Sequence, residues 1–132
     1  VSELFLVEAM SPNPLAELII NIRQDPQFGA ALVLGSGGVL VELLADSATL
    51  LLPTRPVEII RALKGLRVGR LLEGFRGRPA VDIAKVAAEI YKLSINYQEN
   101  IKTITEIEIN PLFVYRAEVS AIDVLIQVPY EN

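Results

Sequence analysis

Four oxygen-bearing side chains near the end of the chain have the spacing of a metal site. Glu106, Glu108 and Asn110 alternate with isoleucines, so in a β-strand all three would project from one face. Asp123 follows thirteen residues after Asn110, and an adjacent antiparallel strand would bring it beside them. Carboxylate and amide oxygens, completed by phosphate and water, are how Mg²⁺ is usually held. An acidic strand edge that faces solvent fits the same spacing, so the residues alone leave both interpretations open.

A glycine-rich segment, Gly35-Ser36-Gly37-Gly38, separates two runs that favour β-strands. Because glycine has no Cβ atom, backbone N–H groups in this segment could approach an anionic ligand closely. The segment lacks the Lys-Ser/Thr of a phosphate-binding P-loop, and it does not match the dinucleotide-binding fingerprint. A tight turn between antiparallel strands explains the glycines equally well.

A second loop carries arginine between glycines. Arg76 lies in Gly74-Phe75-Arg76-Gly77, where the glycines would leave room for a guanidinium group to reach phosphate. A surface loop with ordinary salt bridges is the simpler alternative. Asp25 and Asp46 are expected to serve as turn or cap residues, because aspartate side chains bond readily to nearby backbone N–H groups.

The residue types that are absent narrow the chemistry of the chain. Its 132 residues include no Cys and no His, which excludes disulfides, Cys/His zinc sites, cysteine nucleophiles and histidine general bases built from these residues alone. The formal net charge of −4 disfavours binding to nucleic acid, since such proteins usually present a basic face. Hydrophobic residues make up 52% of the chain, which is high for a domain that stands by itself.

We expect no membrane association and a cytoplasmic location. An uncharged stretch at residues 28–41 contains four glycines and is shorter than the roughly 20 apolar residues of a membrane-spanning helix. Glu3 and Glu8 stand where a signal peptide would carry basic residues. Because the first residue is Val, we expect residues 1–132 to be a single domain or subdomain cut from a longer chain.

Hydrophobic patterning predicts the elements that position these residues. Strands are expected where apolar residues alternate or run together, over residues 4–7, 16–22, 30–34, 39–44, 49–52, 104–109, 112–115 and 121–128. The first two strands are expected to form a hairpin-like pair. Helices are expected from Pro56 to Gly65 and from near Asp82 to about residue 93, with a basic loop at 67–79 between them. The fold class is therefore α/β or α+β.

Six sequence blocks in order give a more specific indication. They are Val7-Glu8-Ala9-Met10, Ala16-Glu17-Leu18-Ile19, Asp25-Pro26-Gln27-Phe28-Gly29, Gly35-Ser36-Gly37-Gly38-Val39-Leu40-Val41-Glu42, Gly74-Phe75-Arg76-Gly77-Arg78-Pro79-Ala80-Val81-Asp82 and Glu106-Ile107-Glu108-Ile109-Asn110-Pro111-Leu112. Together they resemble the ATP-grasp domain of the nucleoside-diphosphate-forming acyl-CoA synthetases. That group includes ADP-forming acetate–CoA ligase and is related to the succinyl-CoA synthetase β subunit. The resemblance covers nearly the whole chain.

The resemblance implies the C-terminal lobe of an ATP-grasp fold, with a mixed, mostly antiparallel sheet and two main helices. It implies a ligase that converts a carboxylic acid, CoA and ATP into acyl-CoA, ADP and phosphate, with phosphate passing to and from a histidine. The N-terminal lobe with its lysine, and a CoA-binding, histidine-bearing domain or subunit, would be partners outside this chain. The full protein would be an oligomer, and the isolated fragment would be inactive.

The resemblance also implies roles for individual residues. Glu108, Asn110 and Asp123 match the positions around the Mg²⁺ ion that accompanies ATP or ADP. The block Glu8-Ala9-Met10 matches the hinge between the lobes, where backbone groups read the edge of adenine. The glycine-rich segment is expected at the nucleotide through three residues, Gly35, Gly37 and Gly38. Three further residues are expected to position phosphate or its loop, namely Glu17, Glu42 and Arg76.

One departure from the family pattern concerns the residues after Asp46. Many relatives carry an arginine a few residues after the matching aspartate, whereas this chain reads Ser47-Ala48-Thr49-Leu50-Leu51-Leu52-Pro53. The resemblance therefore does not carry over a phosphate contact from that arginine, and it leaves open a different substrate or direction of reaction. Two alternatives to catalysis remain open at this point: a regulatory module of a protein acetyltransferase, or a degenerate lobe kept for subunit contact.

Overall fold

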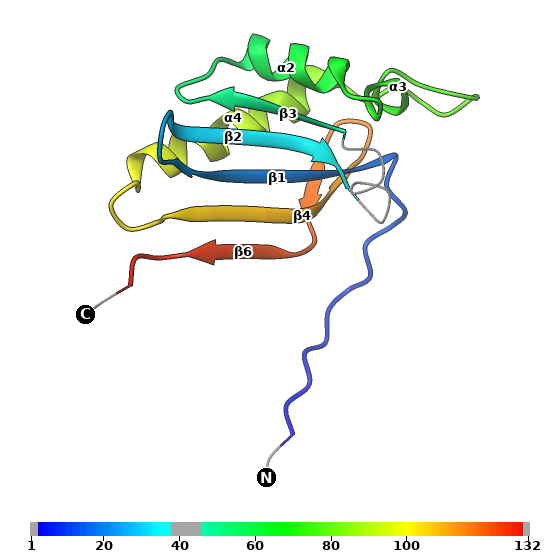
Figure 1. Cartoon of the computed structure of the whole chain (residues 1–132). Coiled ribbons are helices and arrows are strands. Elements are labelled where there is room, and N and C mark those ends of the chain that lie inside the picture. Colours follow the sequence, from blue (N-terminus) through cyan, green and yellow to red (C-terminus); the bar gives the residue numbers. More distant parts are fainter. Residues whose placement is uncertain (1–2, 38–45, 131–132) are drawn as a thin grey trace.

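Helices cover one face of an antiparallel sheet in the computed structural model, which describes residues 3–37 and 46–130 (Figure 1). Within these residues the strands are β1 (Ala16–Asp25), β2 (Gly29–Ser36), β3 (Ser47–Leu51), β4 (Glu106–Val114), β5 (Val119–Ala121) and β6 (Val124–Gln127). The helices are α2 (Pro56–Gly65), α3 (Gly69–Leu72) and α4 (Ile83–Glu99). The predicted class, a mostly antiparallel sheet with two main helices, is confirmed.

The sheet is built around β1, which pairs with β2 on one side and with β4 on the other. The strand order is β3-β2-β1-β4-β5, and β6 also pairs with β4. The turn between β1 and β2 is closed by Asp25, whose Oδ1 accepts hydrogen bonds from the backbone of Gln27 at 2.8 Å and Phe28 at 3.0 Å. Asp25 is therefore a turn residue, as predicted. Gly29 ends the turn at a φ of 83°, in the left-handed region that favours glycine.

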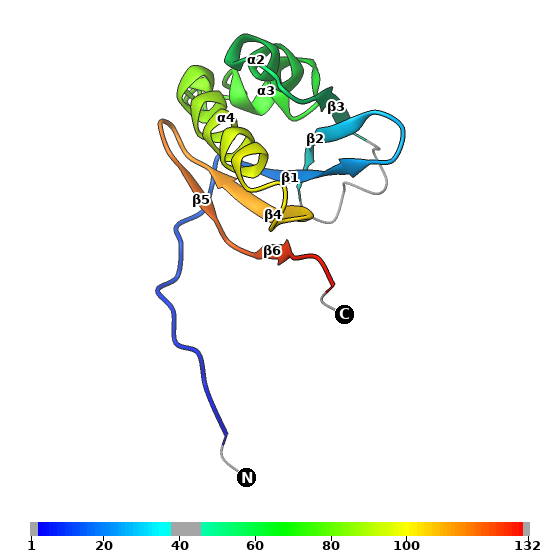
Figure 2. The same ribbon diagram turned by 90° about the vertical axis from the view of Figure 1, so that its left-hand side faces the viewer.

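The hydrophobic core lies between the sheet and the helices (Figure 2). Alternate residues of β1 face it, because successive side chains of a strand point to opposite sides of the sheet. Leu18, Ile20 and Ile22 are completely buried there. Residues of the neighbouring strand and of the two longer helices complete the core, among them Leu32, Leu34, Ile59, Leu63, Val86 and Ile90.

Both main helices begin where the sequence predicts. At the start of α2, Pro56 needs no N–H partner, and the Glu58 side chain accepts a hydrogen bond from the backbone of Arg55 at 3.0 Å. At the start of α4, the Asp82 carboxylate accepts one from the backbone of Lys85 at 3.2 Å. These caps satisfy N–H groups that have no partner inside their helices.

Four predictions differ from the structure, and a further predicted strand lies outside the described residues. The single strand predicted at 121–128 is replaced by two short strands, β5 and β6, which are separated at Ile122 and Asp123. Residues 4–7 form no strand and no hairpin, because in the described chain no other strand lies beside them, and their side chains are 84–93% exposed. The loop predicted at 67–79 contains the short helix α3. The two strands predicted at 104–109 and 112–115 are one continuous strand, β4. The strand predicted at 39–44 lies outside the described residues.

Strand β4 passes through Asn110-Pro111 by means of a bulge. Ile109 lies opposite Ile20 of β1, yet Leu112 lies opposite Leu18, so β4 has one residue more than β1 in this interval. Proline has no N–H group for a sheet hydrogen bond and is tolerated at such bulges. The proline therefore bends the pairing without ending the strand.

The described chain contains no membrane-spanning candidate. Among residues 3–37 and 46–130, no helix combines the length and the apolar character needed to cross a bilayer.

Candidate functional site

The helices leave the opposite face of the sheet uncovered (Figure 2), and strands β1 and β4 place polar residues there. Glu17 and Asn21 of β1 lie on this open face, because they alternate with the buried Leu18, Ile20 and Ile22. Glu106 and Glu108 of β4 alternate in the same way with buried isoleucines. A row of oxygen-bearing side chains therefore crosses the middle of the open face.

A small cleft on this face brings together the three predicted metal ligands. Glu108, Asn110 and Asp123, with Leu125, line a space of about 110 Å³. Strand pairing explains the juxtaposition, since the backbone N–H of Asn110 donates to the carbonyl oxygen of Asp123 at 3.0 Å and Glu108 lies opposite Leu125. Residues thirteen positions apart in sequence are thus neighbours, as antiparallel strands predict.

The donor set of this cleft fits a hard cation such as Mg²⁺. It offers two carboxylates and one amide oxygen, all from exposed or half-buried residues. No group of three or more His, Cys, Asp or Glu able to hold a metal occurs among residues 3–37 and 46–130, so these side chains form no complete cage. Mg²⁺ characteristically binds through one or two carboxylates and takes its remaining ligands from water and phosphate.

Asn21 is a polar residue of the open face that the sequence analysis did not single out. Its Nδ2 donates to Glu106 Oε1 at 2.7 Å, and its backbone lies opposite Glu108. Its Oδ1 is shielded from solvent and accepts no hydrogen bond from the described residues. An unpartnered buried acceptor costs on the order of 1–3 kcal/mol, so this oxygen lowers the stability of the open face. In the sequence, Asn21 is distinguished only as a polar residue between Ile20 and Ile22.

The glycine-rich segment has a structural explanation in the part that is described. The backbone N–H of Gly37 donates to the carbonyl oxygen of Glu17 at 2.8 Å, so this amide is not free for an anion in the present arrangement. A Cβ atom at Gly37 would lie 2.9 Å from the Glu17 carbonyl carbon, and one at Gly35 would lie 3.1 Å from the Asp46 carbonyl oxygen. Gly35 belongs to β2 and not to a loop. Close packing of the backbone therefore explains the glycine at 37, and a side chain at 35 would require the Asp46 carbonyl to shift slightly.

Two of the predicted site residues, Gly38 and Glu42, lie outside the described residues.

Asp46 links the end of β2 to the start of α3. Its buried carboxylate accepts hydrogen bonds from the Ser36 hydroxyl and from the backbone N–H groups of Arg67 at 2.9 Å and Val68 at 3.2 Å. Burial alone would raise the pKa of Asp46, but these hydrogen bonds outweigh burial and hold the pKa below its ordinary value of 3.8. Asp46 is therefore a structural cap, as predicted.

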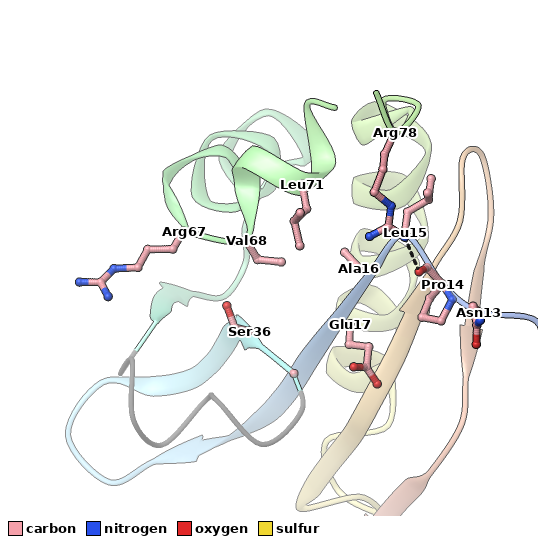
Figure 3. A pocket seen from close by; sticks show the side chains of 11 residues that line it. Asn13, Pro14, Leu15, Ala16, Glu17, Ser36, Arg67, Val68, Leu71 and Arg78 are labelled. Atoms are coloured by element: carbon pink, nitrogen blue, oxygen red, sulfur yellow. Dashed lines mark hydrogen bonds between the residues drawn. The ribbon is translucent and has the colours of Figure 1, made fainter. Parts of the chain in front are cut away.

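A larger cavity, of about 530 Å³, lies at the end of the sheet beside Glu17 (Figure 3). Its lining residues come from the segment before β1, from the end of β2, and from the region around α3: Asn13, Pro14, Leu15, Ala16, Glu17, Ser36, Gly37, Arg67, Val68, Leu71 and Arg78. Figure 3 shows the Arg67 guanidinium pointing away from Arg78, so the two cations do not converge on one point. This cavity has no lining residue in common with the cleft at Glu108, which has the more specific ligand set.

The remaining predicted residues lie apart from the cleft at Glu108. Arg76 is exposed at a φ of 50°, with its guanidinium 5.2 Å from the ring centre of Phe75, and it is not among the residues that line the cleft or the cavity. The block Glu8-Ala9-Met10 belongs to an extended segment that leaves the body of the lobe (Figure 1). The structure thus brings Glu108, Asn110 and Asp123 together but leaves the block Glu8-Ala9-Met10 and Arg76 apart from them.

Comparisons with known proteins agree on the family of this chain. Residues 2–128 match the model of an ATP-grasp domain. The chain is 33% identical over 104 residues to the β subunit of ADP-forming acetate–CoA ligase II from Pyrococcus furiosus, covering 79% of this chain and 44% of that subunit. It is 37% identical over 113 residues to an ADP-forming acetate–CoA ligase from Methanocaldococcus jannaschii, covering 83% of this chain and 16% of that protein.

A solved structure supports the same family. The dinucleotide-forming acetyl-coenzyme A synthetase 1 of Ca. Korarchaeum cryptofilum, in complex with coenzyme A and Mg-AMPPCP, superposes with a TM-score of 0.81 at 32% identity. The match covers 91% of this chain and 55% of the other. The present chain therefore spans only part of the length of its relatives. From the match over residues 2–128, together with the shared fold, the chain belongs to the ATP-grasp domain family.

Proposed function

We propose that this chain is the nucleotide-binding lobe of an ADP-forming acyl-CoA synthetase and that it supplies the protein ligands of Mg·ATP. The observation that carries the proposal is the meeting of Glu108, Asn110 and Asp123 in one cleft of the open face. The relatives named as ADP-forming acetate–CoA ligases support the reaction class. The similar synthetase structure holds Mg-AMPPCP, which supports the nature of the ligand.

The three cleft residues would act by placing oxygen atoms around the cation. When bound, Mg²⁺ neutralises negative charge on the phosphates and thereby assists phosphoryl transfer. Glu108 and Asp123 supply negative charge, and Asn110 supplies a neutral oxygen. Acid–base catalysis by histidine is not available within this chain, which has none.

The segment before β1 does not belong to the open face, and it would complete the nucleotide pocket in the full protein. In our proposal the backbone of Glu8-Ala9-Met10 reads adenine, as in the related hinge. The four apolar residues 4–7 support this, because a run of apolar side chains typically belongs to a strand buried on both faces. The absent N-terminal lobe would provide the partner strand. Glu17, Glu42 and Arg76 remain proposals for positioning phosphate.

The parent protein would contain the rest of the machinery. A CoA-binding domain or subunit with the phosphorylated histidine, and the N-terminal ATP-grasp lobe, would join this chain in a cytoplasmic, oligomeric ligase. One relative is itself named as a β subunit, which supports assembly from more than one part.

The test is binding of Mg·ATP to the full-length protein by calorimetry, with ATP-dependent acyl-CoA formation measured in parallel. Asn110→Ala and Asp123→Ala are each expected to weaken Mg·ATP binding at least about tenfold, because a lost metal ligand typically costs more than 1.4 kcal/mol. Asn96→Ala, which changes an exposed amide on α4, is the matched control. Normal acyl-CoA formation by both cleft variants would show that the metal assignment is wrong.

A further inference from the structure

The chain leaves the lobe through a short segment that is anchored at two carbonyl oxygens. Upstream of this segment, the side chains of residues 4–7 and of Met10 are 84–95% exposed, and Figures 1 and 2 show the backbone extending away from the sheet. Tyr115 donates its hydroxyl hydrogen bond to the carbonyl oxygen of Pro12 at 2.8 Å. Arg78 donates from Nη2 to the carbonyl oxygen of Pro14 at 3.1 Å, as Figure 3 shows.

The anchored segment is stiff for reasons that the sequence provides. It reads Ser11-Pro12-Asn13-Pro14, and each proline fixes its own φ while restricting the residue before it to extended conformations. Little conformational freedom remains to be lost on anchoring, so two hydrogen bonds are enough to define a direction. After the segment, the backbone N–H of Leu15 donates to the Val114 carbonyl oxygen at 2.8 Å and joins the chain to the sheet.

The two donors come from separate loops, and the loop of Arg78 holds it in place. Gly74 and Gly77 adopt φ values of 92° and 79°, and a turn bond runs from the Arg78 N–H to the Phe75 carbonyl oxygen at 3.1 Å. One hydrogen bond, from the backbone N–H of Val81 to the carbonyl oxygen of Leu72 at 2.8 Å, joins the end of this loop to α3. The glycine–arginine loop therefore presents the guanidinium of Arg78, and not that of Arg76, to the segment before β1.

We propose that Arg78 and Tyr115 are positioning residues that fix the direction in which residues 3–10 leave the lobe. They thereby set where the hinge block Glu8-Ala9-Met10 lies relative to the cleft at Glu108. This inference deepens the proposed function and rests on it for its meaning, since the hinge block would read adenine while the cleft holds the phosphates' cation. The geometry itself is independent of nucleotide.

The test is a distance distribution between two nitroxide labels on the 132-residue chain, measured by pulsed electron paramagnetic resonance. The chain has no native Cys, so Met10→Cys and Asn96→Cys give unique attachment sites at an exposed residue of the segment and an exposed residue of α4. In the Arg78→Ala/Tyr115→Phe background, the free length beyond Met10 grows from two residues to five, because the next backbone anchor is Leu15. The distribution is expected to broaden, because the stiff segment then swings about an anchor that is five residues from the label and not two.

Matched variants separate loss of anchoring from loss of folding. Arg70→Ala/Tyr91→Phe removes the same groups from an exposed site on α3 and a half-buried site on α4, and it should leave the distribution unchanged. Tyr115→Phe alone removes one hydroxyl and should give intermediate broadening, with an unaltered circular dichroism spectrum. An unchanged distribution in the Arg78→Ala/Tyr115→Phe chain would overturn the inference. Because the measurement uses no nucleotide, failure of the Mg·ATP test would not produce that result.

Discussion

The two faces of the sheet are made by the same strands but serve different purposes. On the helix-covered face, Leu18, Ile20 and Ile22 of β1 are completely buried. On the open face, the alternate positions include Glu17 and Asn21, which are only half-buried. One strand therefore contributes to stability with every second residue, and the residues between them are free to serve binding.

The open face contains a polar group that lacks a hydrogen-bond partner within the described residues. The Asn21 Oδ1 lacks a partner among the described residues, and the carboxylates of Glu108 and Asp123 share a cleft with one amide. Polar groups that a fold does not use for its own stability are typical of binding sites. The contrast implies that substitutions on the two faces should separate stability from ligand binding.

The largest effect is expected from truncating the covered face. Ile20→Ala should lower the free energy of unfolding by about 3 kcal/mol, because it removes buried methyl groups and leaves a cavity. Ile19→Ala makes the same chemical change on the half-buried open side and should cost less than half as much. Urea denaturation of both variants measures the difference. Equal losses would contradict the division of the strand into two faces.

An intermediate effect is expected where Asp46 joins the sheet to the helical layer. Asp46→Asn should destabilise the chain by about 2 kcal/mol near neutral pH, because an amide cannot accept all the hydrogen bonds now made to the carboxylate. The pKa of Asp46 is lowered in the folded state, so its contribution is complete above the ordinary value of 3.8 and is lost as the pH falls below that value.

Denaturation measured between pH 3 and pH 7 checks this prediction for Asp46. The stability of the variant should depend less steeply on pH at the acidic end than that of the parent chain. Parallel curves for the two proteins would show that Asp46 does not contribute through its charge.

The smallest effect on stability is expected in the cleft at Glu108, where we propose that Mg²⁺ binds. Asp123→Asn should change the free energy of unfolding by no more than about 0.5 kcal/mol without Mg²⁺, because the residue is exposed. With Mg²⁺ and ATP present, thermal unfolding of the full-length protein should show less ligand-induced stabilisation for this variant than for the parent. A large loss of stability without ligand would mean that Asp123 is a structural residue.

Local patterns predicted most of the fold. The helices at Pro56 and near Asp82 follow from apolar spacing and from capping residues that lie within a few positions of each other. That Asn110 and Asp123 are neighbours follows from the antiparallel pairing of two strands that a short connection joins. Such features depend on residues close together in the sequence, and this is why they can be recognised there.

Contacts between distant residues could not be predicted in the same way. The anchors of the segment before β1 join Arg78 to Pro14 and Tyr115 to Pro12, across separations of 64 and 103 residues. Residues 4–7 have the composition of a strand, but a strand needs a partner, and the described chain provides none for them. Whether the Asn21 Oδ1 has a hydrogen-bond partner depends on the residues that surround it in space. The spacing of residues in the sequence does not predict those surroundings.

The bulge at Asn110-Pro111 also changes which alternate residues of β4 face the core. Before it, odd-numbered residues such as Ile107 and Ile109 are buried, and after it the even-numbered Leu112 and Val114 are buried. Without the extra residue, the strand could not bury both pairs while keeping Glu108 on the open face. Both faces of the sheet therefore require the extra residue. Deleting one residue from the bulge would move either the buried residues out of the core or Glu108 off the open face.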